Sequence, residues 1–207
     1  MNIRLLIYIT FLLSFLYSNN ILSQRTNEKK YFPLSVGNQW IYEEIHTHTL
    51  DTLSIIDSQI INGKTYYLTK ENYSKFFWLR MENNRVYIVD TFATYLDSLN
   101  INEYILYDFS ANIGDNWLVK LKSEQADCDY SGIISLESTT DTVFAWYNVF
   151  YNSYYFYRLV PCYDAGRFSE WFADGIGKVA YEEFGFQGGF RYELISRKML
   201  CVSVYRF

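Results

Sequence analysis

The sequence predicts an all-β fold, an antiparallel meander of about a dozen strands that curls into a barrel-like or sandwich domain. Aromatic residues make up 20 % of the chain, with 21 Tyr and 16 Phe, and they fit a pleated, half-buried surface better than a helix. Apolar and polar residues alternate along many short segments. The links between these segments are short, which favours antiparallel neighbours, because parallel strands need long crossovers.

The first half of the chain carries the clearest hairpin signals. Asn62-Gly63 and Asn83-Asn84 are pairs that tolerate positive φ, as a two-residue hairpin turn requires. The segment 91–99 is either one short helix or a loop. Strands are expected over residues 39–49, 52–61, 64–70, 76–82, 85–90, 103–109 and 116–122.

The second half continues the meander and ends in a hairpin around Gln187-Gly188-Gly189. About a dozen strands are more than an open twisted sheet usually holds. We therefore favour a curled, barrel-like sheet. Charges at Glu43, Asp57 and Lys120 interrupt the lipid-facing stripe that an outer-membrane barrel needs. Further strands are expected over residues 133–138, 142–150, 154–161, 168–172, 178–186 and 190–199.

Residues 1–23 have the layout of a secretory signal peptide, and residues 24–207 form a single antiparallel β domain. Arg4 precedes an apolar run from Leu5 to Leu16, and polar residues follow it. The run is shorter than the roughly 20 residues that span a bilayer, which disfavours an uncleaved anchor. We expect cleavage after Ser23 and an extracytoplasmic protein, periplasmic or secreted, that is not an integral membrane protein. No cysteine follows the run, so a lipid anchor is not expected.

Net charge and cysteine content limit the possible partners. The chain has a net charge of −5 without a clustered basic run, which disfavours nucleic-acid binding. Export permits a disulfide, and Cys128 with Cys162 is the favoured pair. The alternative is that all three cysteines are reduced, and any single bridge leaves one of them unpaired, which is Cys201 in the favoured pairing. No CxxC spacing supports a metal site.

His46 and His48 are the only histidines. On a strand, this spacing points both imidazoles to one face, as in a pair of zinc ligands, with Glu44 as a conceivable third. No second metal motif accompanies them. We therefore expect exposed strand histidines, no metal site and no cofactor.

No catalytic residues emerge from the sequence. A GxSxG elbow is absent, and two neighbouring histidines offer few bases for a triad. Glu43-Glu44 and Glu182-Glu183 are adjacent on strands, so each pair points to opposite faces and forms no glycosidase dyad. A hydrolase is therefore the least favoured alternative.

One short pattern occurs twice. The segments 36–41 and 113–118 both read aliphatic, Gly, Asn or Asp, any residue, Trp, aliphatic. A glycine with an unusual backbone conformation followed by a strand whose tryptophan enters the core explains this pattern. We interpret both copies as structural.

A run of aromatic residues over 146–157 is the best candidate for a binding surface. Alternation assigns Trp146, Phe150, Tyr154 and Phe156 to a core face. The opposite face is an all-Tyr stripe, and tyrosines with wet hydroxyls suit a glycan or a protein interface. The alternative is that these tyrosines only cover the sheet. The candidate ligand-binding residues are Tyr147, Tyr151, Tyr155 and Tyr157.

The segment Tyr31-Phe32-Pro33-Leu34-Ser35-Val36-Gly37-Asn38-Gln39-Trp40 resembles the opening of a group of exported bacterial β-meander proteins of unknown function. Later segments agree in order, at 61–64, 106–115 and 172–179. The resemblance implies an exported β-meander and transfers no catalytic residues. Such proteins often carry a C-terminal sorting domain for the cell surface, and we expect none here because the sequence ends at Phe207.

The function expected from these observations is an exported, non-catalytic binding or envelope-associated structural module. Its partner would be an envelope protein or a glycan. Binding of a glycan or a small apolar ligand through aromatic residues is the main alternative. An aromatic-lined cavity inside a closed barrel would favour a small ligand, whereas a filled barrel would favour a macromolecular partner.

Overall fold

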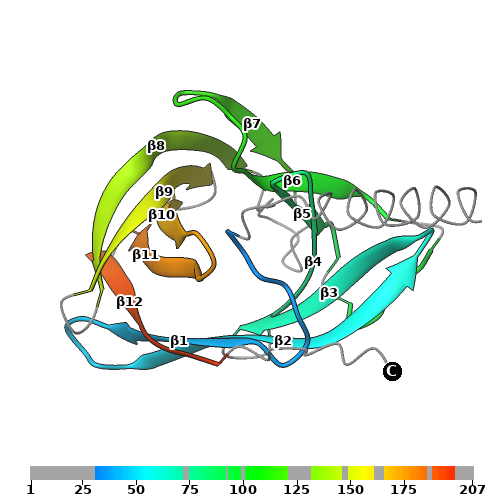
Figure 1. Ribbon diagram of the computed structural model, residues 1–207, viewed down its shortest axis with the longest axis horizontal. Helices are drawn as coiled ribbons and strands as arrows, with labels where there is room; N and C mark the ends of the chain where they lie inside the picture. Colours follow the sequence, from blue (N-terminus) through cyan, green and yellow to red (C-terminus); the bar gives the residue numbers. More distant parts are fainter. Residues whose placement is uncertain are drawn as a thin grey trace, which may run out of the picture.

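One antiparallel sheet of twelve strands curls almost into a closed barrel (Figure 1), so the predicted fold class is confirmed. The computed structural model describes residues 31–71, 75–91, 93–98, 101–120, 132–145, 149–160, 166–185 and 188–198. The strands are β1 (Gln39–Glu44), β2 (Leu50–Ile61), β3 (Lys64–Glu71), β4 (Lys75–Glu82), β5 (Arg85–Val89), β6 (Glu103–Asp108), β7 (Asn116–Val119), β8 (Gly132–Ala145), β9 (Val149–Val160), β10 (Gly166–Ala173), β11 (Gly177–Gly185) and β12 (Gly188–Lys198).

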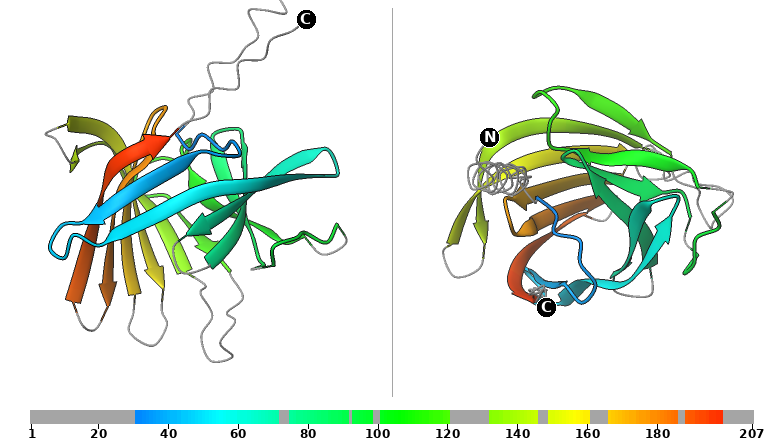
Figure 2. Two further views of the ribbon diagram at one scale, coloured as in Figure 1. Left: turned by 90° about the horizontal axis from the view of Figure 1, so that it is seen from below. Right: turned by 45° about the vertical axis from the view of Figure 1, so that its right-hand side comes forward.

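The sheet begins at β6 and ends at β7. Its order is β6-β5-β4-β3-β2-β1-β12-β11-β10-β9-β8-β7. Strands that are next to each other in the sheet are therefore consecutive in the chain, with one exception. The exception is β1, which pairs antiparallel with β12, as Figure 2 shows. Within the described strands, β6 pairs only with β5, and β7 pairs only with β8. We call the unpaired join between β6 and β7 the seam.

Both predicted asparagine turns form as expected. Asn62 and Gly63 have φ of 51° and 75°, and Asn83 and Asn84 have φ of 52° and 60°. These are left-handed conformations, which asparagine and glycine adopt more readily than other residues. Each pair directly joins two strands of the meander, β2 to β3 and β4 to β5.

Several predicted strands differ in extent from the observed ones: β7 ends at Val119, β8 runs from Gly132 to Ala145, and the largest differences are at 142–150 and 39–49. The segment 142–150 is not one strand, because its first residues continue β8 and its last two begin β9. The strand expected over 39–49 ends at Glu44, since that carboxylate accepts a hydrogen bond from the backbone N–H of His46 at 3.0 Å and a second from Thr47. These bonds hold the chain in a turn, because they satisfy N–H groups that a strand would pair with its neighbour. In the segment 91–99, the described residues contain no helix.

Aromatic side chains fill the end of the barrel that the N-terminal segment crosses. Phe156 and Phe172 lie edge-on to Phe109, with ring centroids 5.3 and 5.6 Å away. Tyr31 stacks on Phe109 at 4.6 Å, and the chain around it runs inside the ring of strands (Figure 1). Side chains rather than open space therefore occupy this part of the interior.

A second, smaller core lies on the outer face of β3, β4 and β5. The segment around Ala93 and Leu96 covers it, because the Trp78 indole N–H donates to the Ala93 carbonyl at 2.8 Å. The side chain of Gln59 bonds both backbone groups of Leu96 at 3.2 Å. The buried members of this core are Ile61, Tyr66, Leu68, Trp78, Val89 and Leu96.

Several sequence predictions lie outside the described residues. These are the signal peptide over 1–23 and the cysteines Cys128, Cys162 and Cys201. Among the residues that are described, no helix is long and apolar enough to cross a membrane.

Candidate functional site

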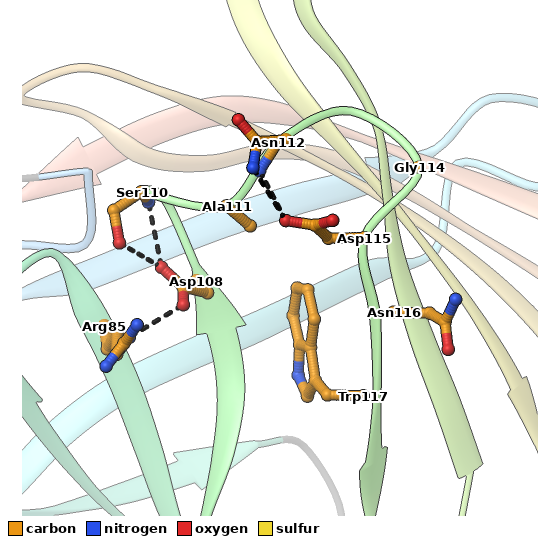
Figure 3. A pocket seen from close by; sticks show the side chains of 9 residues that line it. All are labelled: Arg85, Asp108, Ser110, Ala111, Asn112, Gly114, Asp115, Asn116 and Trp117. Carbon is orange, nitrogen blue, oxygen red and sulfur yellow. Dashed lines mark hydrogen bonds and ion pairs between the residues drawn. The ribbon is translucent and has the colours of Figure 1, made fainter.

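A pocket of about 580 Å³ lies at the seam, where the link between β6 and β7 crosses from one sheet edge to the other (Figure 3). Most of the side chains that line it can form hydrogen bonds. The lining residues are Arg85, Asp108, Ser110, Ala111, Asn112, Gly114, Asp115, Asn116 and Trp117. We call this cavity the seam pocket.

Asp108 and Arg85 form one wall of the seam pocket. They are opposite each other in the β5–β6 register, and Arg85 Nε lies 2.7 Å from Asp108 Oδ2. Asp108 Oδ1 accepts a hydrogen bond from the Ser110 N–H at 2.9 Å. Burial alone would raise the pKa of Asp108, but the hydrogen bonds from Ser110 and the guanidinium of Arg85 outweigh it and lower the pKa. The carboxyl group therefore stays ionised and paired near neutral pH.

The opposite wall is the turn that leads into β7. Asp115 Oδ2 accepts hydrogen bonds from the backbone N–H and the side-chain amide of Asn112, at 2.8 and 3.2 Å. Gly114 has a φ of 89°, which closes this tight link. Asp115 and Asn116 are exposed, so their remaining polar atoms face solvent at the pocket.

Trp117 stands between the two walls. It pairs with Ile134 across β7 and β8, and its ring meets Phe156 edge-on with centroids 6.2 Å apart. Its indole N–H is buried, and it has no hydrogen-bond partner within the described part of the chain. A buried donor without an acceptor costs about 1–3 kcal/mol.

The two copies of the repeated sequence pattern have the same backbone geometry. In the first copy, the Gly37 N–H donates to the Ile55 carbonyl at 2.7 Å, and the Ile55 N–H donates to the Asn38 carbonyl at 2.9 Å. In the second copy, Gly114 and Asp115 make the equivalent bonds to Leu136, at 2.8 and 3.1 Å. The two glycines have φ of 90° and 89°. The pattern is thus one structural motif used twice.

The tryptophans of the two copies differ in what surrounds them. Trp40 is fully buried, donates its indole N–H to the Ile176 carbonyl at 2.6 Å and stacks on Phe32. Among the described residues, none accepts the indole N–H of Trp117, which borders the seam pocket. The first copy is therefore closed by the rest of the chain, and the second is open.

A buried ionic cluster lies deeper in the barrel. Lys178 Nζ lies 2.7 Å from Glu170 Oε1, and the Tyr107 hydroxyl donates to Glu170 Oε2 at 2.7 Å. Burial alone would raise the pKa of Glu170, but the charges of Lys178 and Arg158 outweigh it and lower the pKa. On the same inner face, Tyr181 donates to Asp51. These ionised groups satisfy one another, as a buried ion pair requires.

Two members of the predicted binding stripe, Tyr155 and Tyr157, alternate along β9 with Tyr154 and Phe156. Tyr154 and Phe156 pack in the core, so Tyr155 and Tyr157 lie on the other face of the sheet. Tyr155 stacks on Trp171 with centroids 4.9 Å apart and planes 9° apart. Its hydroxyl lies 3.2 Å from Ser169 Oγ. Tyr157 pairs with Ser135 and Ser169 on the neighbouring strands. Of the other two candidates, Tyr151 lies in β9 and Tyr147 lies outside the described residues.

The two histidines lie in the turn after β1 and not on a strand, so the expected strand placement is wrong. His48 has a φ of 58°, and its Nδ1 lies 2.5 Å from Glu43 Oε1. The carboxylate of Glu44, the conceivable third ligand, bonds the turn backbone instead. Within the described ranges, no group of three or more His, Cys, Asp or Glu could hold a metal ion.

Sequence reasoning missed the seam pocket as a site. The repeated motif contains Gly114, Asp115 and Trp117, but it was interpreted as structural in both copies. The motif itself gave no signal, because the first copy has Asn38 and Gln39 at the positions where the second has Asp115 and Asn116. Arg85 and Asp108 could not be associated, since they lie 23 residues apart and meet only through the β5–β6 register.

No family model and no curated protein matches this sequence. Two solved structures are similar to it. One is a protein of Parabacteroides distasonis whose name proposes a lipoprotein; it has 12 % identity and a TM-score of 0.47, covering 81 % of this chain and 98 % of that one. The other is a protein of Bacteroides fragilis whose name proposes an exported protein with a YmcC-like fold; it has 14 % identity, a TM-score of 0.43 and the same coverage.

Proposed function

We propose that this protein is an exported, non-catalytic binding module of the cell envelope, and that the seam pocket is its ligand site. The observation that carries this proposal is the seam pocket itself, in which polar side chains from β5, β6 and the turn before β7 line one volume of about 580 Å³ beside Trp117. The matched tryptophan of the same motif, Trp40, has its acceptor within the chain. In a small-ligand site, a few convergent polar groups fix the orientation of the ligand.

Export is supported by the N-terminal sequence. Arg4, the apolar run over 5–16 and the polar residues before Ser23 follow the layout of a secretory signal peptide. Expression in a Gram-negative host, followed by mass spectrometry of the periplasmic and culture fractions, tests this part. The expected product begins at or within two residues of Gln24. A full-length product that stays in the cytoplasmic fraction would contradict it.

The state of the buried carboxyl groups supports binding rather than hydrolysis. A glycosidase needs one carboxylic acid with a raised pKa as its proton donor. Ser110 and Arg85 overcome the effect of burial and lower the pKa of Asp108 in the seam pocket. In the interior, Lys178 does the same for Glu170. Neither group is suited to donate a proton near neutral pH.

The proposed site is tested by NMR of the five tryptophan indole N–H groups in the purified protein. Comparison with Trp117→Phe and Trp40→Phe assigns the two resonances of the repeated motif. A fragment library of sugars, amino acids, nucleotides and organic acids is then added. We expect at least one class to shift the Trp117 resonance and to leave that of Trp40 in place. If no class shifts Trp117, the seam pocket is not a ligand site.

A second candidate function is docking of an envelope protein at the edge of β7 that pairs with no described strand. Leu118 and Ile133 are opposite each other on β7 and β8, and they are 51 % and 49 % exposed. Leu159 continues this row on β9. An exposed apolar row beside an unpaired edge suits an extended segment that adds to the sheet.

Photo-crosslinking in the native host tests this second candidate. A crosslinker at position 118 should capture one defined envelope protein, and the same probe at the exposed Ile60 of β2 should not. Ile133→Lys should abolish the adduct. Identical adducts from both positions would show nonspecific contact and contradict the candidate.

A further inference from the structure

We infer that a second copy of this chain pairs with the outer edge of β7, antiparallel to it, about a twofold axis at Leu118. This inference rests on the second candidate function and names its partner. It is independent of ligand binding in the seam pocket. Three features carry it, namely the backbone groups of β7, the apolar row beside them and the charges at the two ends of the strand.

The backbone of β7 points hydrogen-bonding groups away from the barrel. Within the described strands, β7 pairs only with β8, and at the start of this ladder the Leu136 N–H donates to the Asp115 carbonyl at 3.1 Å. Hydrogen bonding alternates along an antiparallel strand, so the backbone groups of Asn116 and Leu118 point to the other edge. In Figure 1 and in the right-hand view of Figure 2, β7 lies at the outer margin of the molecule. A new strand can therefore reach these groups.

Pairing centred on Leu118 matches the two faces of the strand. Asn116, Leu118 and Lys120 are exposed, whereas Trp117 and Val119 between them are partly or fully buried. With Leu118 opposite its own copy, Asn116 lies opposite the second copy's Lys120, and exposed residues meet exposed residues. Centred on Trp117 instead, the pairing would set Leu118 against Asn116, an apolar residue against a polar one. A twofold pair of this kind also closes on itself.

An exposed apolar row beside the edge supplies the surface that this pairing buries. Leu118 and Ile133 are opposite each other on β7 and β8, and they are 51 % and 49 % exposed. Leu159 continues the row on β9. In the dimer, the Cα atom of Leu118 lies about 5.5 Å from that of its own copy, so the two rows join into one. Removing this apolar surface from water favours association.

The charges at the two ends of β7 favour antiparallel over parallel pairing. Asp115 precedes the strand, and the exposed Lys120 follows it. Opposite Asn116, the second copy's Lys120 reaches the seam pocket, whose lining holds one cation, Arg85, and two carboxylates, Asp108 and Asp115. An ammonium group balances the excess negative charge of this lining. A parallel pair would instead bring like charges together at both ends, which costs affinity.

Size-exclusion chromatography with light scattering of the purified protein tests this inference. Two short strands bury little surface, so we expect a dimer that dissociates on dilution from about 500 to about 5 µM. Leu118→Lys places like charges on the twofold axis and should give a monomer over the whole range. Ile60→Lys, at a position of β2 that is 73 % exposed, is the matched control and should leave the dimer intact. A wild-type protein that is monomeric at the highest concentration, or a dimer that survives Leu118→Lys, would overturn the inference.

Lys120→Glu tests the antiparallel arrangement. It sets a carboxylate against the negative lining of the seam pocket, so the dissociation constant of the dimer should rise about tenfold or more. Lys70→Glu makes the same change of net charge at an exposed lysine of β3, and it should have little effect. Equal weakening by the two variants would show a general effect of net charge and overturn the placement of Lys120 at the pocket.

Oxidation of Leu118→Cys locates the twofold axis. Opposite Cα atoms in such a pair lie within the range of a disulfide, so a covalent dimer should form. The wild-type protein, with its three native cysteines, and Ile60→Cys are the controls, and neither should form this dimer.

The photo-crosslinker at position 118 separates failure of this inference from failure of the function on which it rests. If it captures a different envelope protein and the wild-type chain is monomeric, self-pairing is overturned while docking at the edge of β7 stands. If it captures neither a second copy nor another protein, the second candidate function fails as well.

Discussion

Lys178 and Glu170 form an ion pair inside the barrel, with Lys178 Nζ 2.7 Å from Glu170 Oε1. Both side chains are largely buried. Removing one partner leaves an uncompensated charge in a poorly solvated place, which typically costs about 3–5 kcal/mol. Lys178→Met should therefore lower the free energy of unfolding by about this amount in urea titrations.

A matched surface pair provides the control for that variant. Lys64 Nζ lies 3.2 Å from Glu103 Oε2, but the lysine side chain is 45 % exposed. Exposed pairs contribute about 0–1 kcal/mol, so Lys64→Met should have a small effect. Equal losses for the two variants would mean that Lys178 is solvated in the folded protein.

The same buried pair predicts how stability depends on pH. The pKa of Glu170 is lowered, because Lys178 and Arg158 outweigh the effect of burial. A lowered folded-state pKa contributes stability above the unfolded value, near 4.5, and this contribution is lost as pH falls through the folded value. For Lys178, Glu170 and Glu71 outweigh burial and raise the pKa, so its contribution is present below about 10.5 and is lost as pH rises through the folded value.

Unfolding free energies measured from pH 2 to pH 7 test this linkage. The native protein should lose stability below about pH 4.5, and Glu170→Gln, less stable at neutral pH, should show a shallower loss. An unchanged acid slope in the variant would assign the acid sensitivity to other carboxyl groups.

Two glycines in one turn predict different costs for the same substitution. Gly175 and Gly177 have φ of 69° and 99°, so alanine is strained at both. A Cβ at Gly175 would meet nothing within 4 Å, whereas at Gly177 it would lie 3.0 Å from the Trp40 indole nitrogen. Gly175→Ala should cost about 1–2 kcal/mol from backbone strain. Gly177→Ala should cost a further 1–3 kcal/mol, roughly the penalty of overpacking.

Thermal unfolding of both variants, followed by tryptophan fluorescence, distinguishes these costs. Gly177→Ala should also change the emission of the folded state, since it displaces Trp40 or Phe32. If the two variants unfold at the same temperature, the turn relaxes enough to accept the methyl group.

The stack of Tyr155 on Trp171 predicts that one member of the tyrosine stripe is structural. Trp171 is only 7 % exposed, and Tyr155 and Arg191 lie against its ring. Tyr155→Ser should cost about 1–3 kcal/mol, because it exposes the indole and removes the stacked ring. Tyr157→Ser, which leaves the stack of Tyr155 on Trp171 in place, is the comparison. Quenching by iodide should increase only in Tyr155→Ser, and equal quenching in both would contradict this role.

The turn chemistry of the chain made most of the fold predictable. Asn62-Gly63 and Asn83-Asn84 adopt the left-handed conformations that their residue types favour, and they fix two hairpins locally. The end of β1 was not predictable, because it depends on the Glu44 carboxylate folding back onto the backbone of the next turn. Residues 142–150 alternate well enough for one strand, and only tertiary pairing divides them between β8 and β9.

The candidate site was half predictable. The repeated motif gave the position of Trp117 and the turn at Gly114, since both depend on local backbone geometry. Whether the motif is closed or open depends on distant residues, namely Phe32 and Ile176 for the first copy. The wall formed by Arg85 and Asp108 depends in the same way on the register of β5 and β6.

The two tryptophans of the motif predict opposite results for one substitution. Trp40→Phe removes the donor to the Ile176 carbonyl and leaves a buried acceptor unpaired, which should cost about 1–3 kcal/mol in addition to the loss of ring volume. Trp117→Phe removes a buried donor that has no partner in the described chain, so relief of that cost offsets part of the lost packing. Urea titrations should therefore show a clear loss of stability for Trp40→Phe and a change within about 1 kcal/mol for Trp117→Phe. A large loss for Trp117→Phe would mean that its N–H is already satisfied in the folded protein.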